Sequence, residues 1–142
     1  STIHTNSAWG SISRLVDMGV HPYLISNTLV MCVAQRLLRL LCPRCKEKVA
    51  AGKETRTTAG TEQEFHYKPV GCDYCYYTGY KGRKAIYEVI PLDAELSEAV
   101  RSSRDDISAE LSRRGISTLR ESALKLFEEG LISFDELMTQ IQ

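Results

Sequence analysis

Two Cys-x-x-Cys pairs constrain the fold of this chain more than any other feature of its sequence. Cys42 pairs with Cys45 and Cys72 with Cys75, and 26 residues separate the two pairs. Four thiolates are the number that a tetrahedral Zn²⁺ site needs, and each pair places two sulfurs on one tight turn. A closed site of four cysteines leaves no position for a catalytic water. We therefore expect a structural zinc ion bound by these four residues.

Disulfides and free thiols are the alternatives to zinc. Disulfides would require an oxidising compartment, but the sequence shows no signal peptide. Neither pair opens a helix in a βαβ pattern, which argues against a thioredoxin-like redox site. The fifth cysteine, Cys32, lies in an apolar stretch where a buried thiol is ordinary. His66 could replace one thiolate, but with four cysteines present we expect it to be a surface histidine.

Charge and length limit the classes of function. The 142 residues include 18 basic and 18 acidic side chains, so there is no overall attraction to nucleic acid or anionic lipid, and only local patches remain for such partners. The apolar share of 43% and the charged share of 25% are those of an ordinary globular protein. Because the chain starts at Ser1 without a methionine, we expect a piece of a longer protein.

Residues 1–41 predict a strand end followed by two helices. Asn6 or Ser7 caps the first helix, which Gly19 ends. The second helix is expected from Pro22 to about Leu41, apolar on most of its circumference. Polar residues interrupt this run well short of the roughly 18 apolar residues that a membrane span needs; among them are Gln35 and Arg36.

Residues 46–67 and 78–90 predict a loop, a turn and a strand. The segment from Lys46 to Tyr67 has little periodicity, and we expect an exposed, partly mobile loop without a functional role. Glycines punctuate a turn over residues 78–83, and residues 84–90 form a good strand that Pro91 ends.

Residues 93–142 predict four short helices. Asp93 caps the first, and Asp105 or Asp106 caps the second, which Gly115 ends. Thr118 with Glu121 caps the third, which Gly130 ends, and Ser133 with Glu136 caps the fourth. Apolar residues recur on one face of the last two helices, so we expect a small helical subdomain with its own core.

Several landmarks occur in one order across nearly the whole chain: residues 1–6, 14–20, 34–37 running into 41–45, 71–75, 78–83 and 86–88. Together they resemble the secretion-traffic ATPases. Within that superfamily the chain is similar to the C-terminal part of the type II secretion ATPase or the type IV pilus extension ATPase. The tetracysteine insertion favours these two over the pilus retraction enzymes, which lack it.

The resemblance implies an α/β fragment, mostly helical, that comprises the last elements of a RecA-like nucleotide-binding domain, a small zinc subdomain and a C-terminal helical subdomain. Residues 1–41 would end the RecA-like core, and residues 42–78 would form the tetracysteine subdomain. Residues 79–92 would return to the core, and residues 93–142 would form the helical subdomain.

The function that the resemblance implies is that of a motor ATPase. It would work as a homo-hexamer in the cytoplasm, peripheral at the inner face of the bacterial inner membrane and without insertion into it. ATP hydrolysis would drive the platform protein and push pilin or pseudopilin subunits into a filament. His4 matches the family's His box, near the γ-phosphate, where an imidazole can donate a hydrogen bond to a phosphoryl oxygen.

Three further residues are candidates for contact with nucleotide or with a neighbouring subunit. Arg14 follows the His box on the first helix, where it could equally be a solvated cation. Gln35 and Arg36 interrupt an apolar helix, so their polar groups need a partner, which could be nucleotide, a neighbouring subunit or solvent. Arg83 matches the family's glycine-arginine turn, and we assign it no role beyond that turn.

The elements that bind ATP and Mg²⁺ in the family are not encoded in this sequence. There is no Gly-x-x-x-x-Gly-Lys-[Ser/Thr] loop and no apolar strand that ends in paired carboxylates. In the family these elements precede the His box. We therefore expect the longer protein to be an ATPase and the isolated chain to be inactive.

A nucleic-acid-binding zinc ribbon, or a protein-docking module without a motor, is the alternative interpretation. Aromatic and basic residues lie together beside the second Cys-x-x-Cys pair, a mixture that can stack on bases and contact phosphates. They are Tyr74, Tyr76, Tyr77, Tyr80, Lys81, Arg83 and Lys84. The neutral total charge and the acidic flanks argue against nucleic acid.

Overall fold

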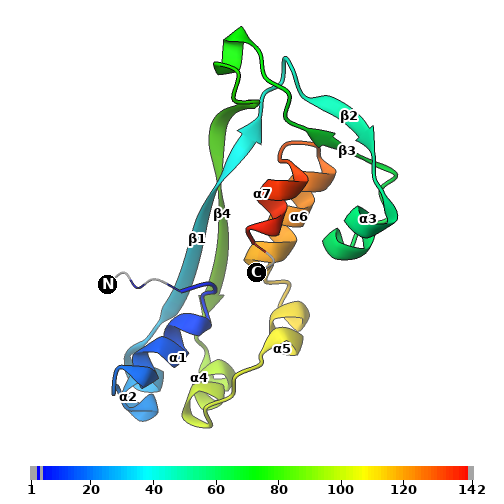
Figure 1. The fold of residues 1–142 in the computed structure, drawn as a ribbon. Coiled ribbons are helices and arrows are strands. Elements are labelled where there is room, and N and C mark those ends of the chain that lie inside the picture. Colours follow the sequence, from blue (N-terminus) through cyan, green and yellow to red (C-terminus); the bar gives the residue numbers. More distant parts are fainter. Residues whose placement is uncertain (1–2, 4, 141–142) are drawn as a thin grey trace. The chain divides into compact units, whose positions relative to one another are not determined.

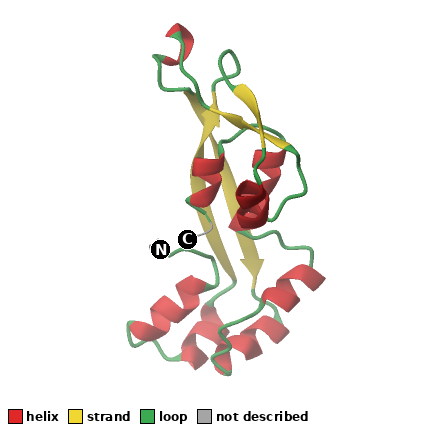
Figure 2. Ribbon diagram, turned by 45° about the vertical axis from the view of Figure 1, so that its right-hand side comes forward, coloured by secondary structure: helices red, strands yellow, loops and turns green. Residues whose placement is uncertain are grey.

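The computed structural model describes residue 3 and residues 5–140, which fall into two compact units. Unit 1 comprises Ser1–Gln35 and Tyr87–Leu119, and unit 2 comprises Arg36–Ile86 and Arg120–Gln142. Two long strands, β1 (Met31–Leu41) and β4 (Tyr80–Pro91), pair with each other and run in opposite directions (Figures 1 and 2). Each strand contributes residues to both units.

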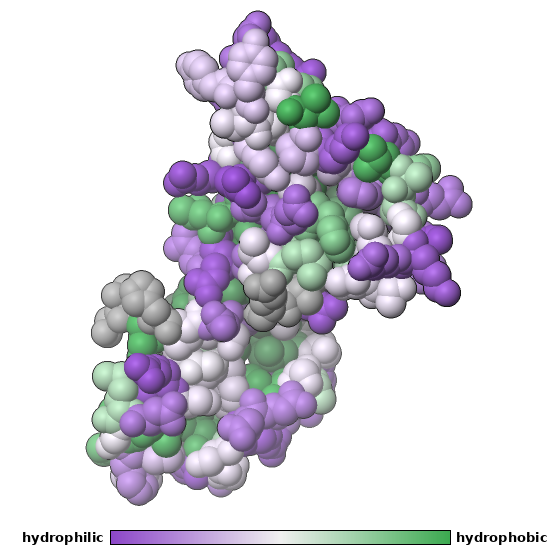
Figure 3. Space-filling model, viewed as in Figure 1, coloured by the Kyte–Doolittle hydropathy of each residue, from purple (hydrophilic) through white to green (hydrophobic). Residues whose placement is uncertain are grey.

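Unit 1 consists of four helices and the adjoining ends of these strands. The helices are α1 (Gly10–Asp17), α2 (Pro22–Thr28), α4 (Ala94–Arg101) and α5 (Ser108–Arg113). Helix α2 packs on α4. The buried apolar side chains are Ala8, Trp9, Ile12, Ile25, Cys32, Ala34, Ile90, Leu96, Ala99, Val100, Ile107, Leu111 and Leu119. Hydrophobic side chains also reach the surface over α1 and α2 (Figure 3).

Local signals in the sequence account for several helix ends of unit 1. The Ser7 hydroxyl accepts a hydrogen bond from the Gly10 N–H at 3.0 Å, so α1 begins three residues after one of its predicted caps. Asp93 caps α4 as predicted, because its carboxylate accepts from the Leu96 N–H at 3.0 Å.

The prediction of a helix from Pro22 to about Leu41 is wrong. Helix α2 ends at Thr28, and the leucine-rich run that follows is β1. Along this strand Cys32, Ala34, Leu38 and Leu41 are buried, whereas the side chains between them are largely exposed. Burial therefore repeats at nearly every second residue, as expected for a strand. The strand forms because it pairs with β4, and the local composition does not reveal this pairing.

Unit 2 contains a short hairpin, three helices and the tetracysteine turns. Strands β2 (Glu47–Ala50) and β3 (Phe65–Lys68) pair antiparallel, with Glu47 opposite Lys68 and Ala50 opposite Phe65. The helices are α3 (Lys53–Ala59), α6 (Leu119–Glu128) and α7 (Phe134–Met138), and α6 begins at the last residue of unit 1. The buried apolar side chains of this unit are Leu38, Leu41, Cys42, Ala51, Ala59, Cys75, Ile86, Ala123, Leu126, Phe127, Ile132 and Leu137.

The segment between the two cysteine pairs is not the loop that its composition predicts. It forms β2, α3 and β3, and both α3 and β3 contact α7. Ala59 and Thr61 are buried, and the Thr61 hydroxyl donates to a Glu128 carboxylate oxygen at 2.8 Å. Contacts with residues about 70 positions away therefore order a segment with little periodicity of its own.

The four predicted C-terminal helices are present, but they divide between the units. Helices α4 and α5 belong to unit 1, while α7 and nearly all of α6 belong to unit 2. Ser133 caps α7 as predicted, since its hydroxyl accepts from the Glu136 N–H at 3.2 Å. Within the described residues, no helix is long and apolar enough to cross a bilayer.

Candidate metal centre

The four predicted ligands come together in unit 2. The sulfur atoms of Cys42, Cys45, Cys72 and Cys75 all lie within 4.8 Å of one another. Neighbouring sulfurs are 3.8 Å apart for Cys45 and Cys75, 3.8 Å for Cys72 and Cys75, and 3.9 Å for Cys42 and Cys72. A tetrahedral zinc site with Zn–S bonds of about 2.3 Å has sulfurs about 3.8 Å apart. The arrangement therefore fits a tetrahedral divalent metal.

Two turns position the sulfurs. In the first, the Cys42 carbonyl accepts from the Lys46 N–H at 3.0 Å and from the Cys45 N–H at 3.4 Å. The second is a short 3-10 helix, η1 (Asp73–Cys75), in which the Cys72 carbonyl accepts from the Cys75 N–H at 3.1 Å. The Cys42 N–H donates to the Gly79 carbonyl at 2.9 Å and so joins the two turns.

Backbone N–H groups point at two of the sulfurs. The Gly71 N–H lies 3.3 Å from the Cys45 sulfur, and the N–H groups of Cys72 and Gly79 lie 3.2 and 3.3 Å from the Cys75 sulfur. Such bonds favour the thiolate, which is the form that binds metal. These donors form an outer shell that would hold the ligands in place around a cation.

The thiols have unequal proton affinities. Burial raises the pKa of Cys75, but the N–H groups of Cys72 and Gly79, helped by the neighbouring thiols, lower it to about 6. Burial raises the pKa of Cys45 to about 12, with a further increase from the other three cysteines. Because adjacent thiolates repel one another, only a cation at the centre would allow all four to lose their protons near neutral pH.

Two glycines are required by the second turn. Gly71 has φ of +122°, and a Cβ there would lie 2.8 Å from the Tyr77 carbonyl oxygen. Gly79 has φ of +77°, and its Cβ would lie 2.4 Å from the Pro69 Cβ. Side chains at these positions would push the turn apart and displace the N–H donors described above.

His66 is not part of the cysteine cluster, but the expectation that it is a surface residue is wrong. Its ring lies 5.7 Å from the Phe127 ring and 6.3 Å from the Phe134 ring, measured between centroids. The residue is half-buried, and its Nδ1 atom is buried without a hydrogen-bond partner in the structure. His66 therefore packs within unit 2.

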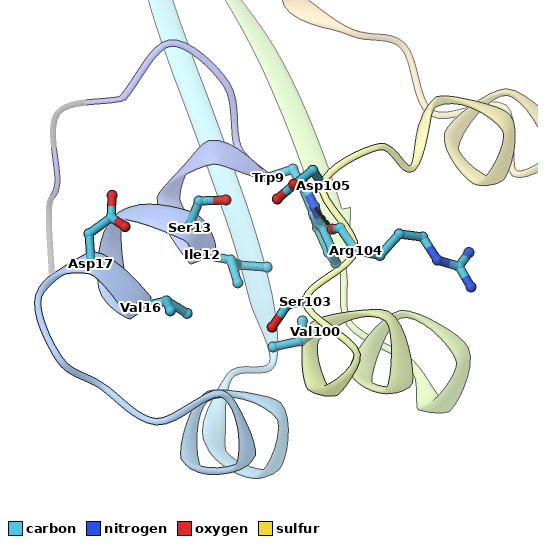
Figure 4. Close-up of a pocket in the computed structure, with 9 residues that line it drawn as sticks. All are labelled: Trp9, Ile12, Ser13, Val16, Asp17, Val100, Ser103, Arg104 and Asp105. Carbon is cyan, nitrogen blue, oxygen red and sulfur yellow. Dashed lines mark hydrogen bonds between the residues drawn. The ribbon is translucent and has the colours of Figure 1, made fainter.

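A small cavity in unit 1 offers no comparable set of ligands. It holds about 140 Å³ and is lined by Trp9, Ile12, Ser13, Val16, Asp17, Val100, Ser103, Arg104 and Asp105 (Figure 4). The Trp9 indole N–H donates to the Arg104 carbonyl at 3.0 Å, and the Arg104 guanidinium pairs with Glu110. The one cation of this lining is thus engaged, so the cavity is poorly suited to a nucleotide phosphate.

The remaining sequence candidates are not among the residues that cluster with the four cysteines in the described part of the chain. His4 is outside the described residues. Arg14 is exposed on α1, whereas Gln35 and Arg36 lie on β1 and not on the helix that the sequence predicts. Arg83 is exposed near the start of β4, directly after Gly82, which has φ of +84°.

The sequence did not predict that two carboxylates are buried. Glu88 on β4 is 4% exposed, and its two oxygens accept from the N–H groups of Ala8 at 2.7 Å and Leu119 at 3.2 Å. Glu136 on α7 is 6% exposed and accepts from the backbone N–H and the Nε of Arg39 at 2.8 and 2.9 Å. The signal for Glu88 was its place at an inward position of a strand, where an unpaired charge is rare.

Comparisons with known proteins agree with the cysteine spacing and the landmark residues. A family model described as "Type II/IV secretion system protein" matches residues 1–139. The chain is 38% identical to the type II secretion system ATPase E of Vibrio cholerae and 41% to the type IV pilus assembly ATPase TfpB of Acinetobacter baylyi. It is 37% identical to the type IV pilus assembly ATPase PilB of Thermus thermophilus.

The chain covers a minor part of these relatives. The three alignments include 97%, 97% and 99% of this chain, but 28%, 25% and 16% of the relatives' own lengths.

Proposed function

The chain belongs to the type II/IV secretion system protein family, and on that premise we propose that it forms the C-terminal part of a motor ATPase that powers type II secretion or type IV pilus assembly. The resemblance inferred from the landmark residues is confirmed at the level of the family. The observation that supports the proposal most strongly is the match over residues 1–139, because it includes both cysteine pairs and the segment that holds His4.

The role of the cysteine cluster in this proposal is structural. Cys42, Cys45, Cys72 and Cys75 would hold Zn²⁺, which when bound would crosslink the two turns and neutralise the thiolates. Four protein ligands close the coordination sphere, so the cluster supplies no activated water. The chain's own contribution is to present four sulfurs with N–H donors already aimed at two of them.

Catalysis would depend on residues of the longer protein together with His4. We propose that the His4 imidazole donates a hydrogen bond to the γ-phosphate of ATP, and that Arg14, Gln35 and Arg36 contact nucleotide or a neighbouring subunit. The working form would be a cytoplasmic homo-hexamer at the inner face of the bacterial membrane, acting on the platform protein. Since the 142 residues encode no phosphate-binding loop, the isolated chain would neither bind Mg-ATP tightly nor hydrolyse it.

The test uses the complete gene product that contains this sequence, with His4→Ala compared with the unmodified protein. A hydrogen bond to charge that develops as the phosphoryl bond breaks is worth about 10²–10³ in rate. We therefore expect turnover to fall by about that factor, while nucleotide affinity changes little. ATPase rate, nucleotide affinity and melting temperature should be measured on one preparation.

His21→Ala is the matched control, because His21 is an exposed histidine at the start of α2. It should leave turnover unchanged. Normal turnover in His4→Ala, combined with a lowered melting temperature, would return His4 to a structural role. Complete absence of ATPase activity in the unmodified gene product, tested with Mg²⁺ and over a range of protein concentrations, would remove the motor proposal itself.

A further inference from the structure

Glu88 is a buried carboxylate that the proposed function does not use. It lies on β4 within unit 1 and is 4% exposed. Its hydrogen-bond partners in the described part of the chain are two backbone N–H groups. A buried charge costs free energy even when it is hydrogen-bonded, and an apolar side chain would be buried on this strand at a lower cost. The carboxylate therefore points to a task beyond filling the core.

The two hydrogen bonds of Glu88 join segments that are far apart in the sequence. The Ala8 N–H donates to one oxygen at 2.7 Å, across 80 positions, and the Leu119 N–H donates to the other at 3.2 Å, across 31 positions. Ala8 lies in the turn before α1, and Leu119 is the first residue of α6. One side chain thus fixes the turn before α1 to β4 and to the start of α6.

The turn that is held in this way follows closely after His4. His4 itself is outside the described residues, and Thr5 comes directly after it in the sequence. The Thr5 hydroxyl donates to the Ser7 carbonyl at 2.9 Å and lies 2.8 Å from the Ser11 hydroxyl. Thr5 is thereby tied to the turn and to α1, and the Ala8 N–H ties the turn to the buried carboxylate.

The anchor is more rigid than an ion pair between two side chains. A backbone N–H cannot change rotamer, and the short bond from Ala8 is charge-assisted. Ala8 is fully buried, as is Ile90, two positions after Glu88 on β4. The next residue of the turn, Trp9, donates its indole N–H to the Arg104 carbonyl at 3.0 Å. The turn is therefore held from two sides, and only one of the two anchors carries charge.

An imidazole that donates to a phosphoryl oxygen needs exact placement. Catalytic groups must be held within about 0.5 Å of the productive position by supporting residues. A misplacement of about 1 Å can cost about 100-fold in rate, even when its cause lies away from the reacting atoms. The backbone that follows such a histidine is one of the supports that decide its position.

We propose that Glu88 is a positioning residue for His4. Through the Ala8 N–H its carboxylate sets the course of the backbone that follows His4, and through the Leu119 N–H it fixes that backbone to the start of α6. Glu88 acts through the backbone alone and contacts no nucleotide. This inference rests on the proposed function, in which His4 donates a hydrogen bond to the γ-phosphate.

The test is a double-variant cycle in the complete gene product, with Glu88→Gln made both in the unmodified protein and in His4→Ala. In the unmodified protein we expect turnover per folded molecule to fall by about 10- to 100-fold. Nucleotide affinity should change little, because placement matters most as the phosphoryl bond breaks. In His4→Ala we expect a further loss of no more than about twofold, since the group that Glu88 positions is already absent. Melting curves give the folded fraction at the assay temperature.

Glu136→Gln is the matched control, because Glu136 is also a buried carboxylate that accepts from a backbone N–H, but it lies in unit 2. It should leave turnover per folded molecule unchanged. Glu88→Asp keeps the charge and shortens the side chain by one methylene group, so its turnover should lie between those of Glu88→Gln and the unmodified protein. If Glu88→Gln does not fold, the same cycle is measured with Glu88→Asp. Amide exchange at Ala8 should quicken in both Glu88 variants and not in the control.

Two results would overturn the inference and leave the proposed function intact. The first is normal turnover per folded molecule in Glu88→Gln. The second is a loss by the same factor with and without the imidazole, which would give Glu88 a structural role independent of His4. Normal turnover in His4→Ala alone is a different outcome, because it would refute the proposed role of His4 and remove the inference with it.

Discussion

The two units each enclose a buried carboxylate, but they use it differently. In unit 1 both oxygens of Glu88 accept from backbone N–H groups, one in the turn before α1 and one at the first residue of α6. In unit 2 Glu136 forms an ion pair with Arg39, whose guanidinium is half exposed. This unit also contains the cysteine cluster, a second organising element. The buried carboxylate of unit 1 thus bonds to backbone groups alone, whereas unit 2 combines a carboxylate in an ion pair with a candidate metal site.

This difference shows where the stability of each unit originates. Replacement of a carboxylate that accepts from two buried N–H groups costs much stability, because the buried donors cannot bond to water instead. A carboxylate paired with a half-exposed arginine is easier to replace, since the arginine keeps access to solvent. The consequences can be tested in order of expected size.

Loss of a metal ligand should produce the largest effect, and only in unit 2. Structural zinc contributes about 10–16 kcal/mol of apparent binding free energy in zinc-finger peptides. In Cys72→Ser we expect the bound metal to fall from one per chain towards zero. Amide hydrogen exchange should then quicken in residues 42–48 and 71–79, while the buried amides of α2 and α4 keep their protection.

Cys32→Ala is the control for the cysteine variant, because Cys32 is a buried thiol outside the cluster and on β1. It should retain the metal. Elemental analysis of the reduced protein measures the ratio. Unchanged metal content in Cys72→Ser would refute the assignment of the ligands, and loss of protection in both units at once would refute the separation between them.

Glu88→Gln should come second in size. The carboxamide keeps one acceptor oxygen but turns an NH₂ group towards the other buried donor, so one of the N–H groups of Ala8 and Leu119 loses its partner. We expect a fall of about 3 kcal/mol in the free energy of unfolding of unit 1, combining a lost charge-assisted bond with an unsatisfied donor. Urea unfolding and exchange at these two amides measure it.

Glu98→Gln is the control for Glu88, because Glu98 is an exposed glutamate on α4 whose partner Arg101 is also exposed. Its unfolding free energy should change by no more than about 0.5 kcal/mol. Equal losses of unfolding free energy in Glu88→Gln and Glu98→Gln would show that the buried hydrogen bonds of Glu88 do not stabilise unit 1.

Glu136→Gln should have the smallest effect of the three. The amide oxygen can still accept from the Arg39 N–H, and the guanidinium turns to solvent. We expect unit 2 to lose about 1.5 kcal/mol, the lower end of the range for a hydrogen bond with a charged partner. Asp135→Asn, at the exposed neighbouring position, provides the baseline. A loss larger than that of Glu88→Gln would reverse the comparison between the two carboxylates.

Features encoded over a few residues could be predicted from the sequence. The Asp93 and Ser133 caps were confirmed, because a cap depends on one side chain and the next three residues. The four cysteines that come together were all predicted, since each Cys-x-x-Cys turn is a local structure. Family membership also followed from short motifs in a fixed order.

Features that need a distant partner could not be predicted in this way. The run from Met31 to Leu41 looked helical, because leucine favours helices and eight of its eleven residues are apolar. Its partner strand, β4, begins about 40 residues later, and only their pairing selects the extended form. The hairpin and helix between the cysteine pairs were missed for the same reason, since α7 provides part of their packing surface.

The sequence by itself determined which four cysteines cluster, several helix ends and the family of the chain, because each of these follows from a motif of a few residues or from the order of such motifs. Only the tertiary structure decided that the leucine-rich run is a strand, that Glu88 and Glu136 are buried anchors and that the tyrosines of the second turn stand exposed beside Arg44 and Lys81. Burial, strand pairing and the position of a charge beside a ring depend on residues tens of positions apart. Their free energies are realised only once the chain has folded.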